Sequence, residues 1–402
     1  MEEFLITPTA WYYMKNLGET NTFLGFTLAA YSAGTLVFSP FIGFLAVKYE
    51  ASKSLVVMCG LVKLFGNVLY SIPVNGYFPL FGRFICGIGE GTTGVLYGAV
   101  TKCTTNENRA KTFLYFEGLY SIGEVCGPAI GSLLIFNFNI LGWKVNAGNS
   151  PGVILAIIWL LLLILTMFLP SDLAEGYEAE NQPSIGNIDS DREINESKSE
   201  ETIAGCPHSV VFCLYFLIFL MMFLTTTSST YIPLLAKYHL GLDLSYVKLL
   251  YLNCSLFAFV FFVATYLLVE RISEKNFIVF GAVSLIFQIL PIFYFALFWD
   301  NDMSVNAAYL LLVSLLFIGA QFVNFALISS LLSKQTPAED ASCYQSLTFT
   351  VAHTSIMLGR ILAGASFHRI PMMYTCLCLS ICWLFGLIWL GIEYKNLEKD
   401  EN

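Results

Sequence analysis

The chain has 402 residues, of which 56% are apolar and 12% are charged, and its formal net charge is −9 at pH 7. Roughly a quarter of the residues of a soluble protein are charged. This composition and the mean hydropathy of +0.69 therefore exclude an ordinary soluble enzyme or nucleic-acid-binding domain and indicate a membrane protein.

Eleven apolar runs are long enough for the roughly 17–25 residues that a spanning helix needs. Each run is continuous and lacks the alternation of apolar and polar residues typical of a transmembrane β-barrel, so we expect an all-α membrane protein. The runs are Thr22–Ala46, Ser54–Ile72, Tyr77–Val100, Thr112–Phe136, Pro151–Leu169, Val210–Ala236, Val247–Val269, Phe277–Phe298, Val305–Leu332, Tyr344–Phe367 and Met372–Ile392.

The segment MEEFLITPTAWYYMKN precedes the first run. Its apolar part of about 14 residues would extend about 21 Å as a helix, against about 30 Å of hydrocarbon. Two interpretations are open, a short interfacial anchor or the outer part of a first helix whose start this chain lacks, and we favour the second. The segment has no basic region or cleavage site of a signal peptide.

The distribution of Lys and Arg orients the helices. With the connection Val47–Lys53 in the cytosol, ten basic residues of the loops and tail lie on the cytosolic side and four on the other side, which predicts a cytosolic C-terminus. The cytosolic set is Lys48, Lys53, Lys102, Arg109, Lys111, Arg271, Lys275, Lys334, Lys395 and Lys399, and the opposite set is Lys15, Lys144, Lys237 and Arg369.

One long loop, Ser171–Pro207, separates two apolar halves and contains ten acidic and two basic residues. Its composition is typical of a disordered tether, with a regulatory or partner-binding role as the alternative. We therefore expect an N-terminal helical bundle over residues 1–170, an acidic cytosolic linker over 171–207, and a C-terminal bundle with a short cytosolic tail over 208–402.

The cysteines do not form a metal-binding pattern. Most of the eleven fall within predicted helices, where they pack as small apolar residues. Cys376, Cys378 and Cys382 lack the spacing and the His or acidic companions of a metal site. The sequence shows no phosphate-binding loop and no nucleophile motif, so we expect no metal, no cofactor and no enzymatic activity.

Two charges lie inside the run Tyr77–Val100. Arg83 and Glu90 are seven residues apart and therefore on nearly one helix face, which they share with Gly87 and Gly91. A charge at mid-membrane costs at least about 2.5 kcal/mol unless it is paired or hydrated, so such residues normally face a bundle interior or a cavity. Glycines beside them leave room for another backbone or for a ligand.

The next predicted helix repeats this design. Glu117 and Glu124 are again seven residues apart, and Gly127, Pro128 and Gly131 follow. The proline frees a backbone carbonyl one turn earlier, so this helix is expected to bend and to pack closely while carrying carboxyl groups.

A similar charge recurs in the C-terminal half. Arg360 lies between Gly359 and Gly364 in mid-helix, and it aligns opposite Glu124, as an internal repeat would leave it. Lys63, on a peripheral helix, is expected to extend to the interface or to pair with an acidic neighbour.

Three stretches resemble motifs of the major facilitator superfamily: RFICGIGEG its fourth-helix motif, GEVCGPAIG its fifth-helix motif, and GFLAVKYEASKS the loop between its second and third helices. Within that superfamily, the chain is most similar to the lysosomal branch called major facilitator superfamily domain-containing protein 8. The third motif departs from the family at Val47, where an acidic residue is usual. The matching residues are Arg83, Gly87, Gly89 and Gly91, then Gly123, Gly127, Pro128 and Gly131, and then Gly43, Leu45, Ala46 and Lys48.

The resemblance implies twelve helices in two six-helix bundles, of which eleven are full and the first is partial in this chain. It also implies a central cavity and alternating access by rocking of the two halves. Helices one, four, seven and ten would line the cavity and place Arg83 and Glu90 on it, although hydroxyls that bond back to their own helix are an alternative for the Ser and Thr residues. The other expected lining residues are Thr227, Thr230, Tyr231, Gln321 and Asn324.

Two interpretations of the buried charges stay open. Arg83 either neutralises Glu90 or Glu124 permanently, or it alternates between substrate and one of these carboxylates, which then binds and releases a proton. Burial disfavours a charged carboxyl and a nearby arginine favours it, so a moving partner can switch protonation. We expect Glu124 to pair with Arg83 in at least one state, and Arg360 to act with them. His353 is either a packed histidine or a proton relay.

We therefore expect a secondary active transporter that moves a small solute across an endolysosomal membrane by alternating access, coupled to protons. One alternative is a passive anion channel whose selectivity element contains Arg83 and Arg360, and another is a receptor or scaffold that transports nothing. The expected partners are membrane lipid, a small-molecule or ion substrate and protons, without nucleic acid, and the expected state is a monomer.

Overall fold

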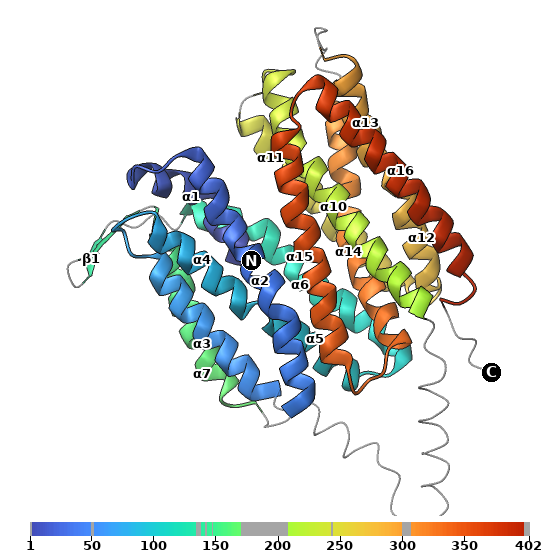
Figure 1. The fold of residues 1–402 in the computed structure, drawn as a ribbon, viewed down its shortest axis with the longest axis horizontal. Coiled ribbons are helices and arrows are strands. Elements are labelled where there is room, and N and C mark those ends of the chain that lie inside the picture. The colour runs from blue at the N-terminus through green and yellow to red at the C-terminus, as the bar shows by residue number, and fades with distance from the viewer. Residues whose placement is uncertain are drawn as a thin grey trace, which may run out of the picture.

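The computed structural model describes residues 2–49, 52–133, 138–140, 143–146, 148–169, 208–242, 244–299 and 307–397. It gives the backbone alone at 3–4, 7–8, 11–12, 21–22, 107, 121–133, 138, 140, 143–144, 244–249, 251–252 and 255. The predicted linker, 171–207, lies outside the described residues. Figure 1 shows two groups of helices side by side, with the blue to green N-terminal half on one side and the yellow to red C-terminal half on the other.

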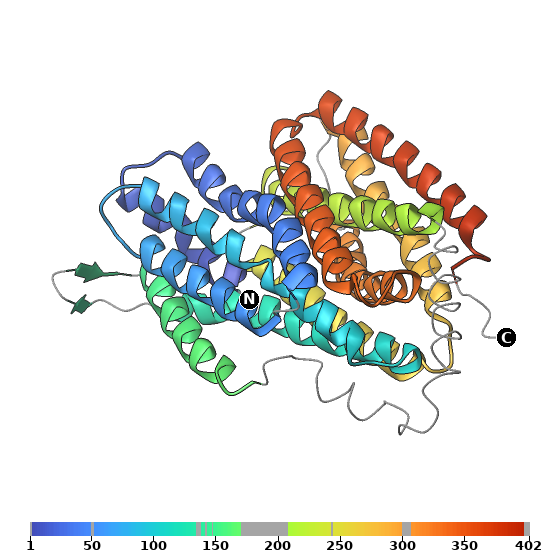
Figure 2. The same ribbon diagram turned by 60° about the horizontal axis from the view of Figure 1, so that its bottom comes forward.

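The N-terminal bundle contains seven described helices and one short hairpin. The strands β1 (Phe138–Ile140) and β2 (Trp143–Val145) pair antiparallel and project beyond the helices, as Figure 2 shows. The helices are α1 (Glu2–Asn16), α2 (Asn21–Tyr49), α3 (Ser52–Tyr70), α4 (Tyr77–Gly89), α5 (Thr92–Lys102), α6 (Asn106–Leu133) and α7 (Ser150–Thr166).

The C-terminal bundle also contains seven described helices, and its two central ones, α10 and α14, bury most of their length. Its helices are α10 (His208–Tyr238), α11 (Leu244–Leu268), α12 (Glu274–Ser284), α13 (Ile286–Leu297), α14 (Ala308–Gln335), α15 (Ala341–Ala365) and α16 (Arg369–Glu393).

Two of the predicted runs are broken rather than continuous. The run Tyr77–Val100 forms α4 and α5, which meet at Glu90, where the backbone N–H groups of Glu90 and Gly91 donate to carbonyls only three residues earlier. Such a tight turn in mid-helix is favoured by the glycines on both sides of Glu90. The run Phe277–Phe298 is likewise divided into α12 and α13.

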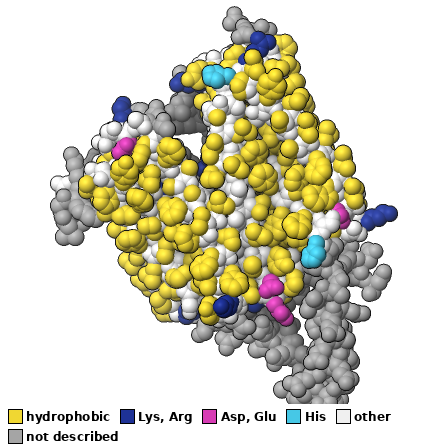
Figure 3. All heavy atoms as spheres, in the orientation of Figure 1, with side chains coloured by type: hydrophobic (Ala, Val, Ile, Leu, Met, Phe, Trp, Pro, Cys, Tyr) yellow, Lys and Arg dark blue, Asp and Glu magenta, His cyan; other side chains and the backbone are white. Residues whose placement is uncertain are grey.

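Six described segments are long and apolar enough to cross a membrane: Phe23–Tyr49, Ser52–Tyr70, His208–Tyr238, Glu274–Leu297, Ala308–Gln335 and Arg369–Glu393. Large apolar side chains are exposed along the outer helices, for example Leu161 on α7 and Ile388 on α16. Figure 3 shows apolar side chains over most of the visible surface, with charged side chains gathered near its ends. This distribution is what a bundle surrounded by lipid requires.

The short first helix packs inside the N-terminal bundle. Leu5, Ile6, Ala10 and Tyr13 of α1 are almost fully buried, and α1 contacts α6, α2 and α7. Of the two interpretations of this segment, its position matches a helix of the bundle rather than an anchor at the membrane surface.

The two bundles meet mainly through three helices of each half. α15 packs against α2 and α5, while α6 packs against α11 and α14. The residues at these contacts therefore decide whether the two halves can separate.

Candidate functional site

Arg83 lies fully buried on α4, with its guanidinium over the ring of Tyr31 on α2. The distance from Arg83 Cζ to the ring centroid is 4.4 Å, within the range of a cation–π contact. Gly87, one turn further along α4, makes this approach possible because a Cβ there would collide with the Tyr31 carbonyl. The Thr35 hydroxyl also donates to the Gly87 carbonyl at 3.1 Å, so the two helices are joined directly below the arginine.

Glu90 lies at the break between α4 and α5 and has three described partners. Lys63 of α3 forms an ion pair with it, and the hydroxyls of Tyr31 and Thr93 donate to its two oxygens at 2.5 and 3.0 Å. A carboxylate that is paired with a cation and accepts two hydroxyl donors is stabilised in its charged form. Arg83 and Glu90 are thus linked through Tyr31.

Lys63 is 5% exposed and connects the site to the first helix. Its ammonium lies 3.4 Å from Glu2 of α1 and 4.6 Å from the ring centroid of Trp159 on α7. Glu2 in turn accepts hydrogen bonds from Asn67 at 2.8 Å and from the Trp159 indole at 3.3 Å. Lys63 therefore pairs with acidic neighbours, one of the two predicted outcomes, and it does so inside the bundle.

We call Glu2, Tyr31, Lys63, Arg83 and Glu90 the central charge cluster. It contains two carboxylates and two cations, so its formal charges balance. All five residues belong to the N-terminal bundle.

The cluster meets the other bundle at His353 of α15, whose ring centroid is 6.3 Å from that of Tyr31. Arg360 follows seven residues later, two helix turns along the same face. It is partly exposed and lies five residues before the end of α15 rather than in mid-helix. Tyr31, His353 and Arg360 thus mark a line along the interface between the bundles.

Gln321 and Asn324 lie inside the C-terminal bundle, between α14 and α12. Gln321 donates to the Ser284 hydroxyl at 3.0 Å, and Asn324 packs directly against Gly281. Both are 1% exposed, so in this state they contribute to packing between helices and do not reach the other bundle.

The threonine hydroxyls of the polar patch on α10 donate mainly to backbone carbonyls of the same helix. Thr227 and Thr230 donate to the carbonyls of Phe223 and Thr226 at 2.7 and 2.8 Å. The Tyr231 hydroxyl lies 2.5 Å from that of Ser366, just beyond α15. These are the back-bonded hydroxyls that stood as the alternative to a cavity lining.

Five predicted residues fall in the part of α6 for which the structure gives only the backbone. The pairing of Arg83 with Glu124 therefore stays a prediction, as do the roles of the small residues beside it. These residues are Gly123, Glu124, Gly127, Pro128 and Gly131.

Small residues bring the two bundles together at the end where α2 and α5 finish and α15 begins. The distribution of Lys and Arg predicts that this end is cytosolic, and we call it the cytosolic end. Gly43, Gly94 and Gly98 have no room for a Cβ because Ser342 and Ser346 of α15 pack on them. Two other predicted glycines pack within the N-terminal bundle, Gly89 against Lys63 and Gly91 against Ile42.

Polar contacts reinforce this closure. The Ser39 hydroxyl of α2 donates to the Ser346 carbonyl at 3.1 Å. Arg109 of α6 donates at 3.2 Å to the Ser333 carbonyl in the last turn of α14, and Lys111 forms an ion pair with Glu270 just beyond α11. A cation at a helix C-terminus also interacts favourably with the helix dipole.

Glycines near the opposite ends of α2 and α15 border open space. A Cβ on Gly25 of α2 or Gly364 of α15 would meet no atom within 4 Å. The surface in Figure 3 is hollowed between the bundles at the top of the view. Tyr31 lies between Gly25 and Gly43 along α2, so the central charge cluster lies between these two ends of the interface.

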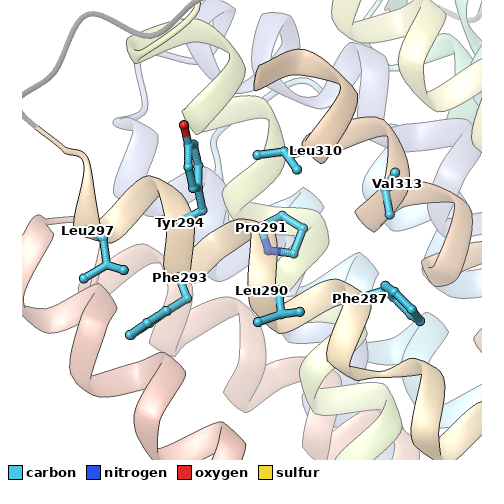
Figure 4. Close-up of a pocket in the computed structure, with 8 residues that line it drawn as sticks. All are labelled: Phe287, Leu290, Pro291, Phe293, Tyr294, Leu297, Leu310 and Val313. Atoms are coloured by element: carbon cyan, nitrogen blue, oxygen red, sulfur yellow. The ribbon is translucent and has the colours of Figure 1, made fainter. Parts of the chain in front are cut away.

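A separate apolar cavity of about 380 Å³ lies on the outside of the C-terminal bundle, between α13 and α14 (Figure 4). Its lining contains no charged side chain, and residues such as Leu290 are half exposed on the surface that faces lipid. Its apolar lining offers a polar solute no charged partner.

The sequence profile of the Major Facilitator Superfamily matches residues 1–359. The chain is 29% identical over 164 residues to the SPX domain-containing membrane protein At4g11810 of Arabidopsis thaliana, which covers 40% of this chain and 23% of that protein. An SPX domain-containing membrane protein of Oryza sativa subsp. indica matches to the same extent. The matched part is less than a quarter of the length of each relative.

Two solved structures share the fold over nearly the whole chain. The human organic anion transporter MFSD10 (TETRAN) superposes with a TM-score of 0.68 at 14% identity and covers 95% of this chain and 88% of its own. The proton:xylose symporter XylE superposes with a TM-score of 0.72 at 15% identity and covers 99% and 92%. The predicted all-α, two-bundle fold is confirmed, and because the family profile covers most of the sequence, the chain belongs to the Major Facilitator Superfamily.

Proposed function

We propose that the protein is a secondary active transporter that carries a small anionic solute by alternating access between the two bundles. The observation that carries the proposal is the asymmetry of the interface. Small residues and Arg109 close its cytosolic end, while Gly25 and Gly364 near its other end border open space. A rocking movement about the central charge cluster would exchange the open and closed ends.

The arginines are the reason for proposing an anion. Arg83 is buried beneath Tyr31, and Arg360 lies two helix turns from His353, which faces Tyr31 from α15. A fixed guanidinium binds carboxylate and phosphate oxygens in a bidentate geometry. MFSD10 is named an organic anion transporter, which makes anions the first class to test here as well.

We further propose that transport is coupled to protons and occurs in an endolysosomal membrane. The support for coupling is the presence of buried carboxyl groups at the interface, and XylE is named a proton symporter. The support for the location is the similarity of the helical motifs to the lysosomal branch of the family. In an organelle with an acidic lumen, export toward the cytosol would follow the proton gradient.

Purified protein in proteoliposomes tests this function. Uptake of a panel of labelled anions, namely inorganic phosphate, chloride, lactate and succinate, would be measured with and without a pH gradient. We expect saturable uptake of at least one of them that increases with the gradient and is lost in Arg83→Ala. The variant Arg369→Ala, which removes an exposed arginine at the start of α16, is the matched control.

The alternatives give different results in the same vesicles. An anion channel would pass current in proportion to voltage, without saturation and without a pH gradient. A receptor or scaffold would show neither uptake nor current. The tightly packed cytosolic end argues against a channel, which needs a continuous path.

A further inference from the structure

Glu117 is a second buried carboxyl group, separate from the central charge cluster. It lies on α6 with 5% exposure, and the Tyr97 hydroxyl of α5 donates to its Oε1 at 2.6 Å. Among the residues that the structure describes, it has no ion-pair partner. A buried carboxylate without a cation is costly, so these surroundings favour the neutral acid.

The contrast with Glu90 is informative. Glu90 is paired with Lys63, and its protonation would leave that ammonium with only Glu2 nearby. Glu117 faces a neutral hydroxyl, so gaining or losing a proton there does not remove the partner of a buried cation. Of these two carboxyls, Glu117 is therefore better placed to change its protonation state.

Among the described residues, no charged side chain of α6 or of the helices packed against it pairs with Glu117. The titratable group in contact with Glu117 is Tyr97 on α5, and Tyr120, three residues after Glu117 on α6, interacts with Tyr97. The described charged groups of α6 and of the helices packed against it lie near the helix ends. They are Glu2 and Lys15 on α1, Lys102 on α5, Arg109 and Lys111 on α6, Glu270 beyond α11, and Lys334 on α14 in an ion pair with Glu274.

Glu117 is also connected to the contact between the bundles. The Tyr97 ring packs against Phe349 of α15 with a centroid distance of 5.2 Å and an interplanar angle of 77°. Gly94 and Gly98, on either side of Tyr97 in the sequence, are pressed against α15 by Ser346 and Ser342. When the cytosolic end opens, Tyr97 must leave Phe349, and water then reaches Glu117.

We infer that Glu117 is the proton-binding group that couples proton release to opening of the cytosolic end. In the closed state it is a carboxylic acid. On opening, its O–H bond breaks, the proton passes to cytosolic water, and the electron pair stays on the hydrated carboxylate. The inference rests on the alternating access of the proposed function.

Hydrogen–deuterium exchange of the full chain in nanodiscs tests the inference without a transported solute. Exchange in residues 92–102 and 341–350 would be followed from pH 5.5 to 8.5 and corrected for the intrinsic pH dependence of exchange. We expect protection of both segments in the wild type to fall as pH rises. In Glu117→Gln, protection should stay high across the whole range, because the amide is a neutral mimic of the acid.

Two further variants sharpen this test. Glu393→Gln changes another buried carboxyl, which accepts hydrogen bonds from Ser209 and Asn396 inside the C-terminal half, and it should keep the wild-type pH response. Tyr97→Phe keeps the ring against Phe349 but removes the donor to Glu117, so the opening transition should move to higher pH. It also provides a readout if Glu117→Gln fails to fold.

A wild-type pH response in both Glu117→Gln and Tyr97→Phe would overturn the inference, as would the absence of any response in the wild type. Failure of the proposed function is a different result, namely no gradient-dependent uptake in vesicles by a protein whose exchange still depends on Glu117. The two failures are therefore distinguishable.

Discussion

The Tyr31 hydroxyl donates a hydrogen bond of 2.5 Å to the Glu90 carboxylate, which joins the middle of α2 to the break between α4 and α5. The ring of the same tyrosine lies over Arg83, and its other neighbour is His353 of the opposite bundle. Tyr31 thus contacts both charges of the arginine–glutamate motif and the facing half of the protein. Movement of one bundle against the other would therefore change the contacts of Tyr31 and, through them, those of Arg83 and Glu90.

We predict that Tyr31→Phe lowers the rate of anion uptake about tenfold, equivalent to about 1.4 kcal/mol. The substitution keeps the ring over Arg83 and removes the donor to Glu90. Because Lys63 and Thr93 still hold that carboxylate, the free energy of unfolding should fall by only about 1 kcal/mol. Vesicle uptake together with thermal unfolding in detergent would show both effects, and wild-type uptake would contradict the prediction.

The Lys63–Glu90 ion pair should show strong coupling in a double-mutant cycle. Lys63→Met alone leaves two buried carboxylates without their cation, and we expect it to lower the free energy of unfolding by about 3–5 kcal/mol. Glu90→Gln should cost less, because Glu2 remains 3.4 Å from the ammonium. The double variant should be less destabilised than the sum of the two losses, and strictly additive losses would show that the pair is not coupled.

A large side chain in place of a glycine that contacts α15 should prevent closure of the cytosolic end. Gly98→Leu places a side chain where Ser342 of α15 packs, so α5 and α15 must separate. We expect faster hydrogen–deuterium exchange in the first two turns of α15 than in the wild type. Gly364→Leu is the matched control, because the same substitution on open space should leave that segment protected.

Arg109 should contribute more to closure of the cytosolic end than the neighbouring Lys111–Glu270 ion pair does. Its guanidinium is 7% exposed and donates to the carbonyls of Thr101, Thr104 and Ser333 at 3.0–3.2 Å. We expect Arg109→Ala to expose the cytosolic end in the same exchange measurement, because three carbonyls lose their donor. Glu270→Gln, at an exposed pair worth about 0–1 kcal/mol, should change exchange much less. Equal effects would show that Arg109 does not hold the bundles together.

The sequence is sufficient to predict the helical bundle because each apolar run must satisfy its own backbone in lipid. It also singles out Arg83 and Glu90, since charges in such runs are costly. The partner of Glu90 was not predicted, because it depends on how closely α3 approaches α4. That approach is set by contacts such as Gly66 against Gly82 and Cys86, which no spacing along one helix reveals.

The break between α4 and α5 at Glu90 is a second reason why the geometry of the site does not follow from the sequence. Seven residues place two side chains on one face only if the helix is continuous, and here it turns tightly between them. Gln321 and Asn324 differ from the expected lining for a related reason, because their direction depends on the rotation of α14 in its bundle. The closed cytosolic end joins residues from both halves, and a sequence does not indicate which state of a moving interface is the more stable.

Alternating access is the central claim, and it is tested most directly by electron–electron distance measurements between spin labels in nanodiscs. One pair at Lys102 and Glu339 would report the cytosolic end, and a second pair at Asn75 and Ile370 would report the opposite end. We predict that between pH 5.5 and 8.5 the first distance distribution shifts to longer values while the second shifts to shorter ones. Distances at both ends that stay unchanged, or that lengthen together, would contradict the account.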